Sequence, residues 1–246
     1  MDRERFIEKI KEKKELKGVS NEFIESIVNR QLKKTKEPTS EKDEKVLLKL
    51  IRAELRMHTG RFHTKTSFTK TSEEELLAAH TSTQERKEHY TFLTSLVDSY
   101  APKSILDVGC GLNPLIMAKP NVTYYACDIH QSEIDRINNH FKEHHISGRA
   151  FTADIRTYTD FPHADVCLVL KVLDIIDTKG RAHAESLLKR LPCKVCIVSF
   201  ATKKLSGKKM NRPRRYWLEK MLSRLNFSYE VHERDNEVFY CITKKN

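Results

Sequence analysis

Membrane and secretion features are missing from this sequence of 246 residues. No apolar run approaches the roughly 20 residues that a membrane-spanning helix needs. Residues 2–5 are all charged, where a secretion signal would have to lead into an apolar stretch. The sequence also has no internal repeat. These absences argue against membrane-spanning helices and a repeat architecture, and they predict a cytoplasmic protein with no membrane partner.

Metal-ligand motifs are also scarce. Cys193 and Cys196 form a CxxC pair, but the second pair that a zinc site usually needs is absent. Both lie at the head of a predicted strand, where residues three apart face opposite sides. His140 and His144 have the spacing of a metal pair on a helix, yet no HExxH motif accompanies them. We therefore predict no metal site and mostly buried, apolar roles for the cysteines.

Positive charge is what the sequence has in excess. Its 45 Lys and Arg outnumber its 34 Asp and Glu, which gives a formal net charge of +11. Such a balance favours a polyanionic partner, a nucleic acid or an acidic membrane face, over a merely basic soluble protein. The segment 203–220 concentrates this charge, with a single acid, Glu219. Its basic residues are Lys203, Lys204, Lys208, Lys209, Arg212, Arg214, Arg215 and Lys220.

The first 60 residues have the apolar spacing of three short helices. Ser20 and Ser40 are typical N-cap residues, and Asp43 has the place of the acid in a capping box. Such a bundle can serve simple packing or dimerisation as well as ligand docking. The helices predicted before residue 100 are 3–17, 20–32, 40–59, 73–79 and 83–99.

Beyond residue 100 the pattern alternates between strands and helices. This alternation predicts a mainly parallel sheet with helices on both faces. The last two strands are close enough for a hairpin, so one edge strand is expected to be antiparallel. The predicted strands are 104–108, 122–129, 149–154, 164–172, 194–200, 228–233 and 238–243. The predicted helices are 132–144, 179–190 and 213–225.

A glycine turn follows the first predicted strand. Gly109 and Gly111 let the backbone approach a ligand closely, but the third glycine of a dinucleotide fingerprint is absent. Asp128 ends the second strand, near the position expected of a carboxylate that binds ribose hydroxyls, and Asp154 ends the third. Asp107 is expected to hold the turn by accepting backbone N–H groups.

A glycine turn with carboxylates after the second and third strands is the layout of class I S-adenosylmethionine enzymes. Asp128 can accept from the two ribose hydroxyls, and Asp154 from the adenine amino group. The alternatives are a nicotinamide enzyme and a sheet protein that binds no cofactor. We predict an α/β fold of the Rossmann-like class I methyltransferase type, with a seven-stranded sheet, an antiparallel edge hairpin and an N-terminal helical subdomain.

The basic segment follows the fifth predicted strand, which places it at the ligand-binding edge of the sheet. A basic loop there can hold phosphates beside a reacting base, and Tyr216 and Trp217 can stack on a splayed base. The competing interpretation of the segment is a solvated loop. For Trp217 we favour core packing of the following helix.

Several segments together resemble the aminoglycoside-resistance 16S rRNA methyltransferases, which methylate N7 of a guanine in the ribosomal decoding site. The resemblance extends from about residue 50 to residue 245. The sequence departs from the family pattern in two places. The loop after Thr202 is shorter, and Gly109 stands where many relatives have alanine. The matching segments are HTSTQER at 80–86, DVGCGLNPL at 107–115, CDIHQ at 127–131, LKVL at 170–173 and VSFATKKL at 198–205.

The resemblance implies roles for individual residues. Lys171 is the catalytic lysine near the target nucleotide. Arg86 binds the cofactor carboxylate, and residues 80–82 close over the cofactor. The full set of implied S-adenosylmethionine contacts is Phe62, His80, Thr81, Ser82, Arg86, Gly109, Gly111, Asp128, Asp154, Ile155 and Leu170. The implied RNA contacts are Lys203, Lys204, Lys208, Lys209, Arg212, Arg214 and Arg215.

The resemblance also divides the chain. Residues 1–60 correspond to an RNA-docking subdomain, 61–100 to a linker and helices that close over the cofactor, and 101–246 to the methyltransferase domain. It implies a monomer that acts on 16S rRNA within the small ribosomal subunit.

The expected reaction is displacement at the sulfonium methyl. Guanine N7 has a lone pair and no proton, so Lys171 orients the base without exchanging protons. The alternatives are a methyltransferase for another rRNA or tRNA base, such as adenine N1, and a catalytically silent RNA-binding assembly factor. A small-molecule or protein methyltransferase is disfavoured by the charge.

Overall fold

The computed structural model describes most of the chain. The predicted helix 73–79 and the first part of the predicted helix 83–99 lie outside the described residues. The description covers residues 2–35, 37–59, 89–177, 180–203, 208–211 and 213–244.

Seven strands of the described chain form one sheet in the order β3-β2-β1-β4-β5-β7-β6. The first five are parallel, and β7 runs antiparallel to both β5 and β6. The predicted sheet and its antiparallel edge hairpin are thus confirmed. The strands are β1 (Ser104–Val108), β2 (Thr123–Asp128), β3 (Gly148–Thr152), β4 (Val166–Leu170), β5 (Val195–Ala201), β6 (Ser228–Glu233) and β7 (Glu237–Thr243).

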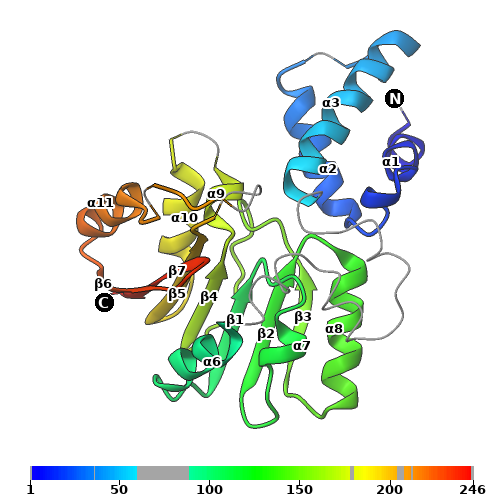
Figure 1. The fold of residues 1–246 in the computed structure, drawn as a ribbon. Coiled ribbons are helices and arrows are strands. Elements are labelled where there is room, and N and C mark those ends of the chain that lie inside the picture. The colour runs from blue at the N-terminus through cyan, green and yellow to red at the C-terminus, as the bar shows by residue number, and fades with distance from the viewer. Residues whose placement is uncertain are drawn as a thin grey trace.

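Helices cover both faces of the sheet (Figure 1). Two of them have only four residues, too few to show apolar periodicity, and the sequence did not predict them. The helix predicted from residue 213 begins at Tyr216. The helices of this part are α6 (Tyr90–Asp98), α7 (Pro114–Met117), α8 (Gln131–Glu143), α9 (Leu173–Ile176), α10 (Ala182–Arg190) and α11 (Tyr216–Arg224).

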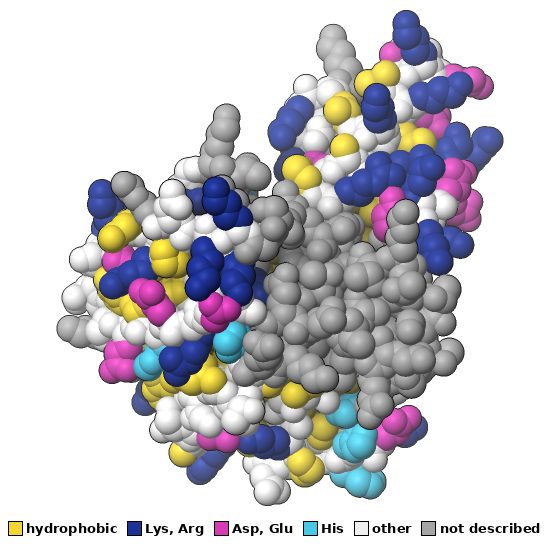
Figure 2. Space-filling model, in the orientation of Figure 1, with side chains coloured by type: hydrophobic (Ala, Val, Ile, Leu, Met, Phe, Trp, Pro, Cys, Tyr) yellow, Lys and Arg dark blue, Asp and Glu magenta, His cyan; other side chains and the backbone are white. Residues whose placement is uncertain are grey.

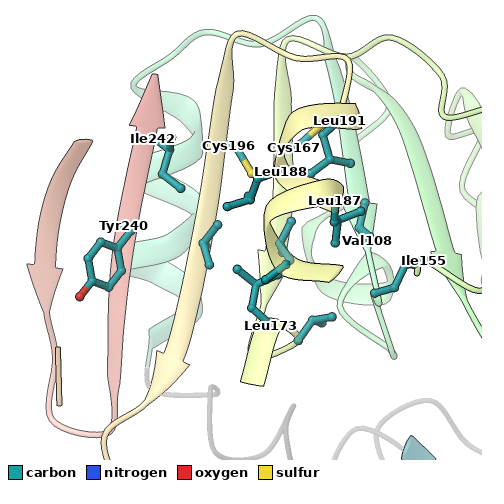
Figure 3. Close-up of a cluster of buried hydrophobic side chains, with 14 of the residues drawn as sticks. Val108, Ile155, Cys167, Leu173, Leu187, Leu188, Leu191, Cys196, Tyr240 and Ile242 are labelled. Carbon is teal, nitrogen blue, oxygen red and sulfur yellow. The ribbon is translucent and has the colours of Figure 1, made fainter. Parts of the chain in front are cut away.

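Two apolar clusters sandwich the sheet. On one face, Leu187 and Leu188 of α10 are fully buried against Cys167 of β4 and Cys196 of β5 (Figure 3). The other face packs against α6, α7 and α8, with Ile137 of α8 fully buried. Strands β4 and β5 are buried along nearly their whole length, as expected for central parallel strands covered on both sides.

The CxxC pair differs from its prediction. Cys193 precedes β5 instead of lying on it, and its thiol is hydrogen-bonded with those of Cys167 and Cys196. The expectation that Cys193 and Cys196 face opposite sides is therefore wrong. These hydrogen bonds lower the pKa of Cys193, partly opposed by burial. The six cysteines, all within the described residues, are free thiols.

The N-terminal helices form a bundle with its own core. Side chains such as Phe6, Ile24 and Ile51 are buried among one another and form a cluster separate from those of the sheet. The predicted helix 3–17 is divided into an α-helix and a short 3-10 helix. The elements are α1 (Arg3–Lys11), η1 (Lys14–Leu16), α2 (Asn21–Leu32) and α3 (Glu41–Thr59).

The predicted helix caps of the bundle are present. Ser20 Oγ accepts from the N–H of Phe23. Ser40 and Asp43 form the reciprocal capping box, with Ser40 N–H donating to Asp43 and Asp43 N–H donating to Ser40 Oγ. These local hydrogen bonds explain why the starts of α2 and α3 were predicted correctly.

A short contact joins the bundle to the sheet domain. The N–H of Ser20 donates to the carbonyl of Ile129 at 2.9 Å, and Val19 forms an isolated β-bridge with His130. Gly18 packs on α8, since a Cβ at this position would lie 2.5 Å from Ser132 Oγ. Because Ile129 and His130 follow β2 directly, the bundle lies beside the carboxyl ends of the strands (Figure 1). Among the described helices, none is long and apolar enough to cross a membrane.

Candidate active site

The glycine turn follows β1. The order of the strands in the sheet reverses between β1 and β4, so the turn lies at the point where sheets of this kind bind ligands. Gly109 and Gly111 have positive φ angles of 69° and 51°, which favour glycine. The N–H groups of Gly109 and Cys110 both donate to the carbonyl of Cys127. A Cβ at Gly109 would lie 2.6 Å from Val172 Cγ2. The turn is therefore held tightly against β2 and the end of β4.

Asp128 holds the turn from the end of β2. Its Oδ2 accepts from the N–H of Gly111 at 3.0 Å, and its Oδ1 accepts from the N–H of Ile129 at 2.7 Å. Asp107, which the sequence suggested for holding the turn, is fully buried and accepts from the hydroxyl of Tyr124. The carboxylate at the end of the second strand therefore helps to hold the turn, and the corresponding role of Asp107 stays a prediction.

One pocket collects the predicted cofactor residues that the structure describes. The turn, the ends of β2 and β4 and the loop after β3 all contribute to its wall. Phe62, His80, Thr81, Ser82 and Arg86 lie outside the described residues. The predicted residues that line the pocket are Gly109, Gly111, Asp128, Asp154, Ile155, Leu170 and Lys171.

Asp154 is held by its neighbour Arg156. The guanidinium donates from Nε to Oδ1 at 2.8 Å and from Nη2 to Oδ2 at 2.6 Å, and Ser26 of α2 donates to Oδ2 at 3.1 Å. Burial alone would raise the pKa of Asp154, but the hydrogen bonds and charge of Arg156 outweigh it and lower the pKa below its usual value. The carboxylate at this end of the pocket is therefore ionised and fixed in orientation.

Lys171 has a strained backbone at the carboxyl end of β4. Its φ is +61°, in the left-handed region that a lysine seldom adopts. The Nζ lies 3.5 Å from Glu237 Oε2, and the lysine side chain is only 8% exposed. Glu237 is fully buried and accepts from the hydroxyl of Ser199. Strain of this kind concentrates at functional sites, where surrounding contacts maintain it.

His130 lies beside Asp128 in the pocket wall. Burial lowers the pKa of its ring, but the hydrogen bond that the ring donates to Asp128 and the charges of Glu133 and Asp128 outweigh it, so the pKa is raised. The ligand atoms of these three residues lie within 4.8 Å of one another. Because the Nδ1 of His130 is 3.1 Å from Asp128 Oδ1, the ring helps to orient the carboxylate. The sequence prediction of no metal site stays a prediction.

Several residues that line this pocket were not predicted from the sequence, and three of them meet at the junction with the N-terminal bundle. Phe23 and His58 come from the N-terminal bundle, and Arg156 follows Asp154. Burial and the charge of Arg156 lower the pKa of His58 to about 4, so its ring is neutral near pH 7. Arg156 could have been noticed from its place two residues after a predicted strand-end acid. Phe23 and His58 show no such signal, because long-range packing places them.

The basic segment is partly neutralised by acids of the same chain. Lys203 and Lys209 both pair with Asp235, at 2.5 and 3.1 Å. Arg214 pairs with Glu219 at 2.8 Å. Lys208 is exposed, and Lys204 and Arg212 lie outside the described residues.

Arg215 has internal partners instead of an exposed position. Its guanidinium is bound to Asp174 at 2.9 Å and to the carbonyl of Ala201 at 3.1 Å, and its side chain is only 12% exposed. It also lies over the ring of Phe200. These contacts favour a structural role for this predicted RNA contact.

The two aromatic residues at the start of α11 differ in exposure. Trp217 packs against Phe200 of the core, with ring centroids 5.8 Å apart, and Arg181 covers its ring at 4.3 Å. The favoured interpretation of Trp217 as a packing residue is consistent with these contacts. Tyr216 is 59% exposed and remains available for stacking.

A comparison with protein families identifies the chain's relatives. Residues 13–241 match the family model described as Ribosomal RNA methyltransferase (FmrO). The chain belongs to the FmrO family of rRNA methyltransferases. The resemblance inferred from the sequence motifs is therefore confirmed, and the chain is a member of a methyltransferase family.

Curated proteins similar to this FmrO-family chain are named 16S rRNA (guanine(1405)-N(7))-methyltransferase. One from Serratia marcescens is 28% identical over 175 residues, which cover 68% of each chain. Another, from Frankia casuarinae, is 25% identical over 179 residues, covering 68% of this chain and 62% of the relative. The match thus spans slightly less than two thirds of the Frankia protein.

Solved structures share the whole fold with this FmrO-family member. The 16S rRNA methyltransferase RmtF, in complex with S-adenosyl-L-homocysteine, superposes with a TM-score of 0.82 at 22% identity and full coverage of both chains. The 16S rRNA methylase RmtB gives 0.78 at 23% identity, covering 100% of this chain and 99% of its own. At such identities the likeness establishes the fold, which is the class I methyltransferase fold.

Proposed function

We propose that this chain is an S-adenosylmethionine-dependent 16S rRNA (guanine-N7) methyltransferase that acts at the decoding site of the small ribosomal subunit. The observation that carries the proposal is the single pocket that joins the glycine turn, Asp128, Asp154 and Lys171 at the carboxyl edge of the sheet. Membership in the rRNA methyltransferase family and relatives named for guanine N7 support the substrate.

The pocket residues fit the proposed cofactor. One lone pair of Asp128 Oδ2 accepts from the N–H of Gly111, so the second lone pair can accept from a ribose hydroxyl. Asp154, which is ionised, and Ile155 line the part of the pocket that we assign to the adenine. A Cβ at Gly109 would collide with Val172, so glycine allows the turn to pack closely in this part of the pocket wall. When bound, the cofactor supplies an electrophilic methyl group on its sulfonium.

Lys171 is the residue we assign to the target base. It lines the pocket at the end of β4, and its ammonium is fixed beside the buried carboxylate of Glu237. Guanine presents N7 and O6 as two acceptors on one edge. A lysine that donates to O6 would hold N7 toward the methyl group. Because N7 carries no proton, this positioning replaces general-base catalysis.

The RNA-facing surface is proposed to combine the N-terminal bundle with the basic loop before α11. Figure 2 shows Lys and Arg side chains both on the N-terminal helices and around α9 and α11. Lys208, which is exposed, and the partly neutralised Lys203, Lys209 and Arg214 are candidate phosphate contacts. We further propose that the enzyme is a cytoplasmic monomer and that residues 1–60 dock on the ribosomal RNA.

Methyl transfer from labelled S-adenosylmethionine tests this proposal. We expect the wild-type chain to label the small-subunit RNA and Lys171→Ala to lose most of this activity while still binding S-adenosylhomocysteine. Full turnover by Lys171→Ala would contradict the role of the lysine. Cofactor binding without transfer to any RNA would favour the silent assembly factor, and transfer only to tRNA or to an adenine would favour the other methyltransferases.

A further inference from the structure

Arg156 joins the N-terminal bundle to the cofactor pocket. Its guanidinium binds Asp154 with two hydrogen bonds and lies over the ring of Phe23 at 5.1 Å. Its Nη1 is 3.5 Å from Nε2 of His58. Phe23 and His58 in turn meet edge to face, with centroids 5.7 Å apart. One side chain of the sheet domain thus contacts the pocket carboxylate and two helices of the bundle.

This junction is part of the pocket wall. Phe23 of α2 and His58 of α3 line the same cavity as Asp128, Asp154 and Ile155. A ligand that fills the cavity therefore touches both the sheet domain and the bundle. A ligand that binds two parts in one arrangement stabilises that arrangement by its own binding free energy.

Among the described residues, few polar side chains join the bundle to Asp154 and Arg156. On the other side of Asp154, a second hollow lies between the bundle and the end of β3 and is lined by Glu22, Ser26 and Tyr158 among others. The contacts of Phe23, Ser26 and His58 with Asp154 and Arg156 separate the two cavities. Phe23 also belongs to the apolar core of the bundle, so the contacts of Ser26 and His58 are the ones whose loss would loosen the junction and leave both cores intact.

We propose that Arg156 and His58 couple occupancy of the cofactor pocket to the docked position of the N-terminal bundle. This inference rests on the proposed function. His58 is a positioning residue whose neutral ring accepts from Arg156, while Arg156 holds Asp154 for the adenine. Cofactor binding then strengthens the docked arrangement. By reciprocity, any RNA that binds the docked bundle tightens the binding of the cofactor.

Two measurements on the full-length protein test the coupling. Calorimetry gives the affinity for S-adenosylhomocysteine, and hydrogen exchange followed by mass spectrometry gives the protection of α2 and α3 with and without this ligand. For the wild type we expect the ligand to slow exchange in both helices. For His58→Ala and Arg156→Ala we expect about tenfold weaker binding and loss of the ligand-dependent protection.

Matched variants serve as controls. His144→Ala and Arg149→Ala remove the same side chains at exposed positions away from the junction, and both should behave as the wild type. His58→Gln keeps an acceptor and should recover part of the affinity and the protection, which keeps the test valid if the alanine variants are unstable.

The outcomes separate the two proposals. If the wild type binds the ligand but His58→Ala keeps both the affinity and the protection of α2 and α3, the coupling is overturned and the proposed function stands. If the wild type binds no S-adenosylhomocysteine, the proposed function fails and the coupling fails with it.

Discussion

Lys171 and Glu237 form an ion pair that is almost wholly shielded from solvent. Their Nζ and Oε2 atoms are 3.5 Å apart, with side-chain exposures of 8% and 0%. The lysine comes from the end of β4 and the glutamate from the start of the antiparallel strand β7. The edge hairpin therefore supplies the counter-charge that allows a cation to be buried beside the cofactor pocket.

The first prediction concerns this ion pair. Glu237→Gln removes a fully buried carboxylate beside the Lys171 ammonium, which should cost about 3–5 kcal/mol of stability. Combining it with Lys171→Met should restore much of the loss, because no uncompensated charge remains. Thermal unfolding of both variants measures this effect. Methyl transfer should stay low in both, whereas a double variant with full transfer would show that Lys171 has no role in the reaction.

The second prediction concerns the carboxylate at the end of β2. Asp128→Asn removes a charged acceptor, so affinity for S-adenosylhomocysteine should fall by about 1.5–3 kcal/mol. The pKa of His130 should also fall, because the charge and hydrogen bond of Asp128 raise it in the wild type. Calorimetry and an NMR titration of the ring measure the two effects. If the affinity for S-adenosylhomocysteine stays unchanged while the pKa of His130 falls, Asp128 is not a cofactor ligand.

Much of the candidate site could be predicted because its residues stand at strand ends. Gly109, Asp128 and Asp154 each follow a recognisable apolar strand, and parallel strands bring their carboxyl ends to one edge. His58 could not be predicted from local pattern, since only the packing of the bundle brings it to the pocket. The pairing of Glu237 with Lys171 could not be predicted either, because the predicted strand bounds left Glu237 in the connection between the last two strands.

The basic segment shows a different limit of prediction from sequence, which concerns the partners of charged side chains. Its charge predicted a surface that contacts RNA, but the charge count does not reveal which cations have internal partners. Arg215 is bound to Asp174 and packs on Phe200, whereas Lys208 is exposed. Local sequence could not separate these two cases, because Asp174 lies 41 positions away from Arg215.

The third prediction contrasts these two cations. Lys208→Ala should leave thermal stability unchanged, weaken RNA binding and lower the slope of log affinity against log salt by about 0.7–0.9. Arg215→Ala should instead lower the unfolding free energy by about 2 kcal/mol, because several partly buried hydrogen bonds and the packing on Phe200 are lost. Thermal unfolding and RNA binding over a range of salt concentrations measure both. Equal behaviour of the two variants would contradict the assignment.

The fourth prediction follows from the neutral ring of His58, which faces Arg156 and is also influenced by Glu54, Arg30 and Asp154. Its pKa is lowered from 6.5 to about 4, so the unfolded chain takes up the proton first as pH falls. The stability from this group is complete above pH 6.5 and is lost as pH falls toward 4. The loss should be on the order of 2 kcal/mol, since the ring keeps some exposure.

His58→Gln should remove this part of the pH dependence. Urea unfolding between pH 4 and 7 compares the variant with the wild type, and the His144→Ala protein serves as the control for an exposed histidine. If the wild type and His58→Gln lose stability in parallel over this range, the ring is not the group that responds.

The most direct test of the account is the chemical identity of the product. Small ribosomal subunits are incubated with the protein and labelled S-adenosylmethionine, and the modified nucleotide is located by chain cleavage specific for N7-methylguanosine and by mass spectrometry of the digested RNA. We expect one N7-methylguanosine in the decoding region of 16S rRNA, and none with Lys171→Ala. A methyl group on adenine, on another RNA or on no RNA at all would contradict it.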